Sequence, residues 1–297
     1  MTADEVTQDT VEWAALWREA IERLERVGVP SPDIDARRIV EQASGAEPVE
    51  FHDVLRRPAT RRGVAAFDAM LARREAGEPL QYVVGRWGFR YLDLLVDRRV
   101  LIPRPETEVV AGLAIDAVNA VDGHAVLVDL GTGSGAIALS VAQECLSVEV
   151  HASDVDVAAL AVARANLAGL GRAARQVTVH EGSWFEALPA RLRGGIDVLV
   201  SNPPYVADDE VLPPVVADWE PGTALRAGPD GLDDLRSIVE GAGEWVRPEG
   251  TVVLEMSSSQ TATVTGWFDG MGWSATTHSD LAGRPRAVVA HRPTGSS

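Results

Sequence analysis

Three observations predict a doubly wound α/β fold for the later part of this 297-residue chain. Continuous apolar runs such as residues 125–130 and 196–200 are typical of parallel strands buried on both faces. From about Glu106 onward such runs alternate with helical stretches, which is the order of a parallel sheet wound by helices. The first run ends in a glycine-rich loop that leads into a helix of small residues.

The first 75 or so residues predict a small helical bundle instead. Apolar residues recur there on one face of each helical stretch, and Ser31 and Thr60 stand at N-cap positions. The predicted helices cover residues 12–27, 32–44, 49–55 and 60–74. This bundle is expected to be a domain of its own, residues 1–76.

Residues 89–101 predict two strands with a charged turn near Asp97-Arg98-Arg99, as a β-hairpin linker within residues 77–105. Residues 106–297 form the expected main domain. The strands of its sheet are predicted at residues 125–130, 148–153, 176–180, 196–200, 250–255 and 286–291.

The tetrapeptide Asn202-Pro203-Pro204-Tyr205 follows a predicted strand, at the carboxyl edge where open α/β sheets bind ligands. The Asn202 side-chain oxygen and the Pro203 carbonyl can each accept one N–H of a planar NH2 group. The prolines fix φ and add no competing N–H, and Tyr205 offers a flat face for stacking. The alternative is a proline-rich turn without a binding function.

A glycine-rich loop follows the strand at 125–130 and consists of Gly131, Thr132, Gly133, Ser134 and Gly135. Glycines at a helix N-terminus let the backbone approach a ligand closely. Asp154 ends the next predicted strand, where its carboxylate can accept hydrogen bonds from two ribose hydroxyls. Loop and acid together indicate an adenosine-type cofactor, without choosing between NAD and S-adenosylmethionine.

The tetrapeptide Asn202 to Tyr205 decides between NAD and S-adenosylmethionine. A clamp for an NH2 group has no use in hydride transfer, whereas it suits methylation of a nitrogen. We therefore expect S-adenosylmethionine, and we expect Trp184 either to pack against its adenine or to be an ordinary core residue.

The chain resembles the HemK/PrmC protein-glutamine methyltransferases from about residue 77 to 286. The matching blocks are Gly77 to Tyr82, Val100 to Glu108, the glycine loop, Asn202 to Tyr205, Glu220-Pro221, Asp230 to Asp233 and Asp280 to Arg284. This resemblance implies a Rossmann-like class I methyltransferase sheet. It also implies methyl transfer to the Gln of the Gly-Gly-Gln loop of class I peptide chain release factors, with the helical bundle helping to position that partner.

The resemblance also implies roles for single residues. Asn202 and Tyr205 are expected to be catalytic, and the whole tetrapeptide is expected to bind the substrate amide. Arg104 and Glu106 are expected to shape the substrate pocket. The glycine loop, Asp154, Trp184 and Asn202 are expected to contact the cofactor.

Three positions depart from the family pattern: Ser183, where Asp is usual and would contact the adenine amino group, Ser257 in place of Gly, and Tyr91 in place of a small residue. They keep open a paralogue with altered cofactor affinity or substrate. A second alternative is an adenine-N6 DNA methyltransferase, because the same tetrapeptide can grip a flipped base. A third is a non-catalytic module that binds release factors or ribosomes.

Composition favours a soluble, cytoplasmic enzyme, which we expect to be a monomer although the sequence does not determine the oligomeric state. The chain is 46% hydrophobic, carries a net charge of −17 and opens on an acidic, polar segment without an apolar stretch. Its acidity argues against nonspecific DNA binding. One cysteine and six scattered histidines predict neither a disulfide nor a metal site.

All 27 basic residues are arginines. Eleven of them fall between Leu55 and Arg104 against five acids, so this block is locally basic with a net charge of +6. The block is either a set of solvated helix faces or a docking surface for an acidic protein partner.

Overall fold

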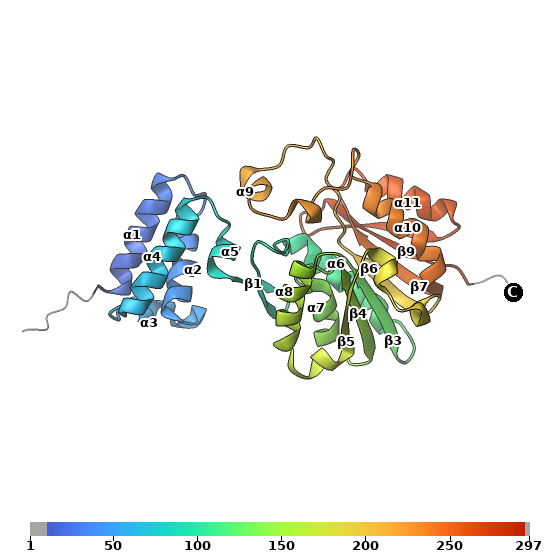
Figure 1. Cartoon of the computed structure of the whole chain (residues 1–297), viewed down its shortest axis with the longest axis horizontal. Coiled ribbons are helices and arrows are strands. Elements are labelled where there is room, and N and C mark those ends of the chain that lie inside the picture. Colours follow the sequence, from blue (N-terminus) through green and yellow to red (C-terminus); the bar gives the residue numbers. More distant parts are fainter. Residues whose placement is uncertain (1–10, 295–297) are drawn as a thin grey trace, which may run out of the picture. The chain divides into compact units, whose positions relative to one another are not determined.

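The protein is described by a computed structural model in which residues 11–294 are described, and these divide into two compact units, one that ends at Gly85 and one that begins at Arg86 (Figure 1). The division falls after Gly85, inside the stretch 77–105 that the sequence assigns to the linker. The first ten residues of the predicted N-terminal domain lie outside the described residues.

The first unit is helical. Its elements are α1 (Trp13–Arg26), α2 (Pro32–Ser44), the 3-10 turn η1 (Pro48–Glu50), α3 (Phe51–Val54), α4 (Arg61–Glu75) and α5 (Leu80–Val84). The Thr60 cap is confirmed, since its hydroxyl accepts a hydrogen bond of 3.0 Å from the Gly63 N–H. Ser31 stands at the expected N-cap position of α2, but its side chain makes no capping hydrogen bond.

The helices α1, α2 and α4 enclose a core of their own. Leu24, Ile39 and Phe67 are fully buried, and Trp13 meets the Phe67 ring edge-on with 6.5 Å between centroids. Arg74 on α4 pairs with Asp35 on α2 at 2.6 Å, and both side chains are largely buried. The buried apolar side chains of these helices therefore pack on one another and form the core of this unit.

The second unit opens on a hairpin whose turn was predicted at the wrong place. Strands β1 (Arg86–Phe89) and β2 (Leu92–Leu95) pair antiparallel and turn at Arg90-Tyr91, before the charged stretch near Asp97. Arg90 adopts a positive φ of 50°, and its guanidinium is held by Glu144 at 2.6 Å. A distant ion pair thus stabilises a turn that has no Gly, Asn or Asp to reveal it.

A seven-stranded sheet in the order β5-β4-β3-β6-β7-β9-β8 forms the centre of this unit. Its strands are β3 (Ala125–Leu130), β4 (Val148–Asp154), β5 (Val177–Glu181), β6 (Ile196–Ser201), β7 (Val246–Glu255), β8 (Ser274–Ser279) and β9 (Pro285–His291). The doubly wound sheet is confirmed, but it is not wholly parallel: β8 was not predicted, and β9 runs antiparallel to β7 and β8. Only residues 280–284 join β8 to β9, and a parallel pair needs a crossover of roughly a dozen residues or more.

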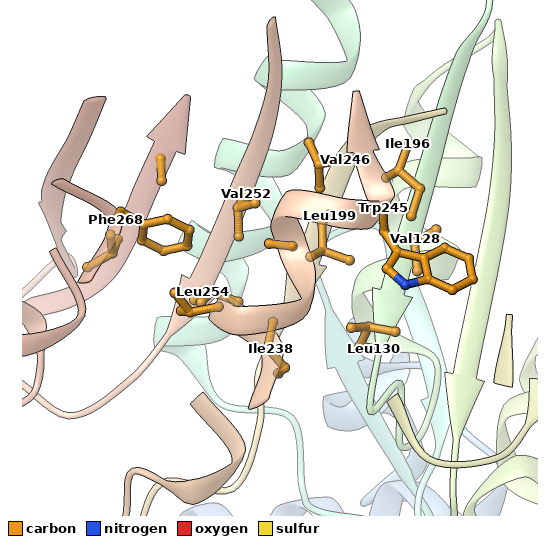
Figure 2. Packing of buried hydrophobic residues seen from close by; sticks show 14 of the residues in the cluster. Val128, Leu130, Ile196, Leu199, Ile238, Trp245, Val246, Val252, Leu254 and Phe268 are labelled. Atoms are coloured by element: carbon orange, nitrogen blue, oxygen red, sulfur yellow. The ribbon is translucent and has the colours of Figure 1, made fainter. Parts of the chain in front are cut away.

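Helices cover both faces of the sheet (Figure 1). They are α6 (Pro105–Asn119), α7 (Ala136–Glu144), α8 (Val157–Ala168), α10 (Asp233–Trp245) and α11 (Thr261–Gly270), with the short α9 (Pro214–Ala217) in the segment after β6. Figure 2 shows Ile238 and Trp245 of α10 and Phe268 of α11 packed on Leu130 and Leu254 of the strands. Neighbouring residues of a strand point to opposite faces, so Asp129 points away from this cluster.

The strand register aligns the carboxyl ends of the central strands. Leu130 at the end of β3 pairs with Ser153 of β4 on one side and with Ser201 of β6 on the other. The glycine loop, Asp154 and the tetrapeptide follow these three ends directly. The confirmed strands therefore bring three motifs, separated in sequence, to one edge of the sheet.

Two glycines of α10 give a matched test of packing around this edge. A Cβ on Gly241 would lie 2.2 Å from the Phe185 ring, which stacks on Trp245, whereas a Cβ on Gly243 would meet only Met271 at 3.5 Å. We expect Gly241→Ala to lower the free energy of unfolding by about 1–3 kcal/mol through overpacking. Gly243→Ala should raise it by about 0.5–1 kcal/mol through helix propensity. Urea unfolding followed by circular dichroism measures both, and equal effects of the two variants would contradict the packing described here.

Candidate functional site

A cavity of about 270 Å³ opens at the carboxyl edge of the sheet. Its wall combines the segment before α6, the glycine loop, the ends of β4 and β5, the tetrapeptide and the start of α10. The lining residues include Thr107, Asp129, Gly131, Thr132, Gly133, Ser134, Asp154, Ser183, Trp184, Asn202, Pro204 and Asp234. Most residues predicted to contact a cofactor thus line this one cavity, whereas Gly135 does not.

The glycine loop takes a backbone path that other residues rarely adopt. Gly131, Gly133 and Gly135 have φ values of 71°, 55° and 87°, all in the left-handed region. The Thr132 N–H donates to the Ser153 carbonyl at 2.8 Å, which ties the loop to the end of β4. Helix α7 begins directly after Gly135, so the loop presents backbone N–H groups at a helix N-terminus.

Asp154 supports this loop as well as the cavity wall. Its carboxylate accepts the Gly133 N–H at 2.8 Å and the Asp156 N–H at 2.9 Å, one on each oxygen. Burial raises the pKa of this carboxyl above its usual range, while the two backbone N–H groups act in the opposite direction. Each oxygen retains a lone pair, so the group can accept hydrogen bonds from neighbouring hydroxyls in addition.

Asp129 is a cavity residue that the sequence analysis missed. It is 1% exposed, and its Oδ2 accepts from the Thr132 hydroxyl at 2.6 Å and from the Ala138 N–H at 3.2 Å. Its Oδ1 has no hydrogen-bond partner among residues 11–294, and burial raises the pKa of the group to about 7. An unpartnered buried acceptor suits a cationic ligand group. The available signal was an acid inside an otherwise apolar strand.

The tetrapeptide is split between the cavity wall and the protein interior. Asn202 and Pro204 line the cavity, whereas Pro203 is buried and Tyr205 is partly buried beside the core cluster. The Asn202 Nδ2 donates to the Thr107 hydroxyl at 3.3 Å. This bond turns the amide nitrogen toward α6 and leaves the side-chain oxygen as the group that can accept from a ligand.

Tyr205 is fixed mainly through its backbone. Its N–H donates to the Leu225 carbonyl at 3.2 Å, and its own carbonyl accepts from Gln260 Nε2 at 2.9 Å. Burial, followed by the charge of Glu255, raises the pKa of the phenol above its usual range. The hydroxyl therefore stays protonated at neutral pH and acts as a hydrogen-bond donor.

Trp184 lies on the cavity wall against the glycine loop. A Cβ on Gly131 would be 3.4 Å from its ring, and the residue has an unusual positive φ of 40°. Ser183 is exposed on the same wall. Asp234, another residue that the sequence analysis missed, interacts with the Trp184 side chain, and burial raises the pKa of its carboxyl. Asp is usual at the position of Ser183, and this chain also has a carboxylate close by, but that carboxylate belongs to α10.

Arg104 and Glu106 do not line the cavity. Arg104 forms an ion pair with the buried Glu220, whose other oxygen accepts the Ile102 N–H at 3.1 Å. Glu106 pairs with Arg284 at 2.8 Å. Both residues thus fix the segment around the start of α6 to later parts of the chain. The block Glu220-Pro221 has the same structural role, because Glu220 is the acid that pairs with Arg104.

The eleven arginines of the basic block divide into three groups. Six form ion pairs with acids: Arg73, Arg74, Arg86, Arg90, Arg99 and Arg104. Arg98 lies over the Trp219 ring at 4.3 Å. The remaining four, Arg56, Arg57, Arg61 and Arg62, are exposed around the start of α4 and make no ion pair within residues 11–294.

Among the described residues, no group of three or more His, Cys, Asp or Glu side chains is placed to hold a metal ion. Nor does the described part of the chain contain a helix long and apolar enough to cross a membrane.

Comparisons with known proteins agree with this geometry at the level of class. A family model for the PrmC N-terminal domain matches residues 15–85, and one for the methyltransferase small domain matches residues 113–218. A methyltransferase structure from Pyrococcus furiosus superimposes with a TM-score of 0.50 at 17% identity, over 68% of this chain and 89% of that one, which concerns the fold alone. Fold and family model together define a class I, Rossmann-like methyltransferase, a class that depends on S-adenosylmethionine.

Relatives in sequence indicate which family of this class the chain belongs to. A release factor glutamine methyltransferase of Streptomyces coelicolor is 42% identical over 92% of this chain and 96% of its own length. One from Cereibacter sphaeroides is 40% identical over 93% and 97%. The chain belongs to the family of release factor glutamine methyltransferases.

Asp129→Asn tests the cavity electrostatics without any ligand. In the native state the carboxyl keeps its proton up to about pH 7, whereas the unfolded chain loses it near its ordinary pKa of 3.8. The native protein thus binds more protons between these values, and this contribution to stability falls as the pH rises from 4 to 7. The Asn oxygen can keep both bonds made by Oδ2. We therefore expect the free energy of unfolding of the variant, relative to that of the wild type, to rise between pH 4 and pH 7.

The gain should be about 1–4 kcal/mol in the free energy of unfolding, since each pKa unit corresponds to 1.36 kcal/mol. Urea unfolding at several pH values between 4.5 and 8 measures the difference. A stability difference that does not change with pH would show that Asp129 titrates normally.

Proposed function

We propose that this chain transfers a methyl group from S-adenosylmethionine to the side-chain amide nitrogen of the Gln in the Gly-Gly-Gln motif of class I peptide chain release factors. The observation that carries the proposal is the orientation of Asn202: its NH2 group is bonded to Thr107, which leaves an amide oxygen at the cavity wall. The names of the curated relatives support the choice of substrate. Since release factors act during translation, we place the reaction in the cytoplasm.

The cavity wall suits the proposed cofactor. Asp129, with its unpartnered Oδ1, would meet a cationic group, and S-adenosylmethionine carries an ammonium and a sulfonium. Asp154 would accept hydrogen bonds from ribose hydroxyls at the end of β4. Trp184 offers an aromatic face for adenine, and Asp234 offers an acceptor for its amino group. When bound, the cofactor supplies a methyl group on a sulfonium that is already a good electrophile.

The residues of the chain act on the nucleophile. An amide nitrogen shares its lone pair with the carbonyl and is a poor nucleophile as it stands. The Asn202 side-chain oxygen and the Pro203 carbonyl would each accept one N–H, orient the nitrogen and stabilise the positive charge that develops on it. Pro203 and Pro204 add no N–H that would compete. The nitrogen gives up its proton to water after the transfer, so the chain needs no strong base.

We further propose that the N-terminal helical unit docks the release factor. Four exposed arginines, Arg56, Arg57, Arg61 and Arg62, have no acidic partner within residues 11–294, although the chain as a whole carries a charge of −17. Cations without a partner inside the protein are available to acids on another protein. The other arginines of the block are occupied by ion pairs or an aromatic ring.

The decisive experiment offers two possible acceptors together. Purified class I release factor and adenine-containing DNA are incubated with enzyme and labelled S-adenosylmethionine, and the products are analysed by mass spectrometry. Label should appear on the Gly-Gly-Gln glutamine and be lost when that Gln is replaced by Ala. Label in DNA would favour the adenine-N6 alternative, and cofactor that fails to bind at all would favour a non-catalytic module.

Asn202→Ala should separate chemistry from cofactor binding. Loss of one hydrogen bond that acts in the transition state commonly lowers turnover by about 10²–10³. The affinity for S-adenosylmethionine, measured by calorimetry, should stay close to that of the wild type because the side chain acts mainly on the substrate amide. Wild-type turnover by this variant would refute the clamp.

Docking is tested by a pair of double variants. Arg61→Gln/Arg62→Gln should raise the KM for the release factor about 10-fold, leave kcat nearly unchanged and lose this effect at high salt. The control, Arg164→Gln/Arg172→Gln, removes two exposed arginines from the second unit and should change neither constant. Equal KM values for the two double variants would remove the basis for docking at this surface.

A further inference from the structure

The side chain of Gln260 ties together three segments near the cavity. It stands at the N-cap position of α11 and is 7% exposed. Its Nε2 donates to the carbonyls of Tyr205 and Gly231, each at 2.9 Å, and its Oε1 accepts the Ser257 N–H at 3.1 Å. An amide NH2 group has two protons, so both are used, and the three partners fix which way the amide faces. The mechanism above gives this buried side chain no role.

Ser257 contributes its backbone to this arrangement. It is one of the three departures from the family pattern, where Gly is usual. Its hydroxyl lies 3.0 Å from that of Ser259, while its N–H donates to Gln260. A glycine would present the same N–H, so the departure leaves the bond to Gln260 intact.

The tetrapeptide depends on hydrogen bonds at its two ends. Its two prolines have no N–H, so neither can donate a backbone hydrogen bond to a neighbouring segment. The front end is held where Asn202 donates to Thr107. At the rear end, the Tyr205 N–H donates to the Leu225 carbonyl and the Tyr205 carbonyl accepts from Gln260. The bond from Gln260 is made by a side chain, so a substitution can remove it and leave the backbone of the tetrapeptide unchanged.

The loop before α10 supplies the fixed point for this bond. Gly231 has a φ of 69°, and a Cβ on it would lie 2.4 Å from the Tyr205 carbonyl oxygen. Glycine permits both this close approach and this conformation. Helix α10 begins two residues later and packs into the core cluster through Leu235 and Ile238. Gln260 therefore connects the tetrapeptide to a loop whose position is set by the core.

We infer that Gln260 is a positioning residue, which holds the tetrapeptide so that the Asn202 oxygen and the Pro203 carbonyl face the methyl acceptor. This inference rests on the proposed function. The fixed φ angles of the two prolines make the segment stiff, so a shift of the Tyr205 carbonyl moves the acceptors before it. A misplacement of about 1 Å can cost about 10²-fold in rate. Loss of the bond from Gln260 should accordingly lower turnover.

A pair of glutamine variants tests the inference through kinetics. Gln260→Glu keeps the shape and the acceptor for Ser257, but its carboxylate cannot donate to the two carbonyls. We expect kcat for the release factor to fall about 10–10²-fold. The affinity for S-adenosylmethionine, measured by calorimetry, should stay close to that of the wild type.

The control is Gln176→Glu. The Gln176 Nε2 also donates to two carbonyls, those of Ala142 at 2.7 Å and Cys145 at 3.2 Å, and Gln176 does not line the cavity. This variant loses the same kind of bonds, so its stability should fall, but its kcat should match that of the wild type.

A pair of glycine variants displaces the same carbonyl from the other side. Gly231→Ala brings a Cβ to 2.4 Å from the Tyr205 oxygen, whereas the Cβ of Gly272→Ala meets nothing within 4 Å. The φ values of 69° and 78° give both variants a similar backbone strain. Only Gly231→Ala should lower kcat, and equal kcat values of the two variants would overturn the inference.

Hydrogen exchange separates this inference from the proposed function, because it needs no release factor. The N–H groups of Tyr205 and Val206 both donate to the Leu225 carbonyl, at 3.2 and 2.9 Å. Their protection from exchange should fall about 10-fold in Gln260→Glu and stay unchanged in Gln176→Glu. Unaltered protection in Gln260→Glu, or an equal fall of kcat in both glutamine variants, would overturn the inference even if the release factor is methylated. If the wild type does not methylate the release factor, the protection still decides whether Gln260 holds the tetrapeptide.

Discussion

The register of β3 between β4 and β6 is the constraint on which the rest of the site depends. The pairing of Leu130 with Ser153 and Ser201 puts the ends of three strands side by side. A slip of one residue would turn every side chain of the strand to the other face and carry Asp129 away from the cavity. Such a slip is costly because it would turn the Asp129 carboxyl into the apolar cluster that now holds Val128 and Leu130.

The sequence predicts those elements whose signals are local. Apolar runs, glycines and a capping Thr60 locate the central strands, the loop and the helices to within a few residues. The hairpin turn at Arg90 and the antiparallel β9 escape prediction, because a distant Glu144 holds the former and the short link at 280–284 dictates the latter. The first cause is tertiary, so no window of neighbouring residues contains it. The second is local, but it becomes visible only once β8 is recognised as a strand.

The residues of the candidate site also include some that the sequence indicates and some that only the structure reveals. Asn202 and Asp154 can be recognised from the sequence because adjacent residues place each of them at the end of a predicted strand. Asp129 gains its significance from its burial, and Asp234 gains it from burial and from Trp184, a partner far earlier in the chain. Thr107 likewise joins the site through a bond to the distant Asn202. Arg104 and Glu106 show the converse: these two charged residues of a conspicuous block form ion pairs that fix the backbone, and the cavity is lined by other residues of that block.

The position of β9 has a consequence for the order in which the sheet can form. This strand, Pro285–His291, lies between β7 and β8 although it follows both of them in the chain. Until β9 has been added, β8 has no neighbour among the described strands, and the surface around Phe268 and Trp273 lacks Val288 and Ala290. Strands β7 and β8 therefore join one sheet only through a strand that comes later than either, so this half of the sheet is completed last.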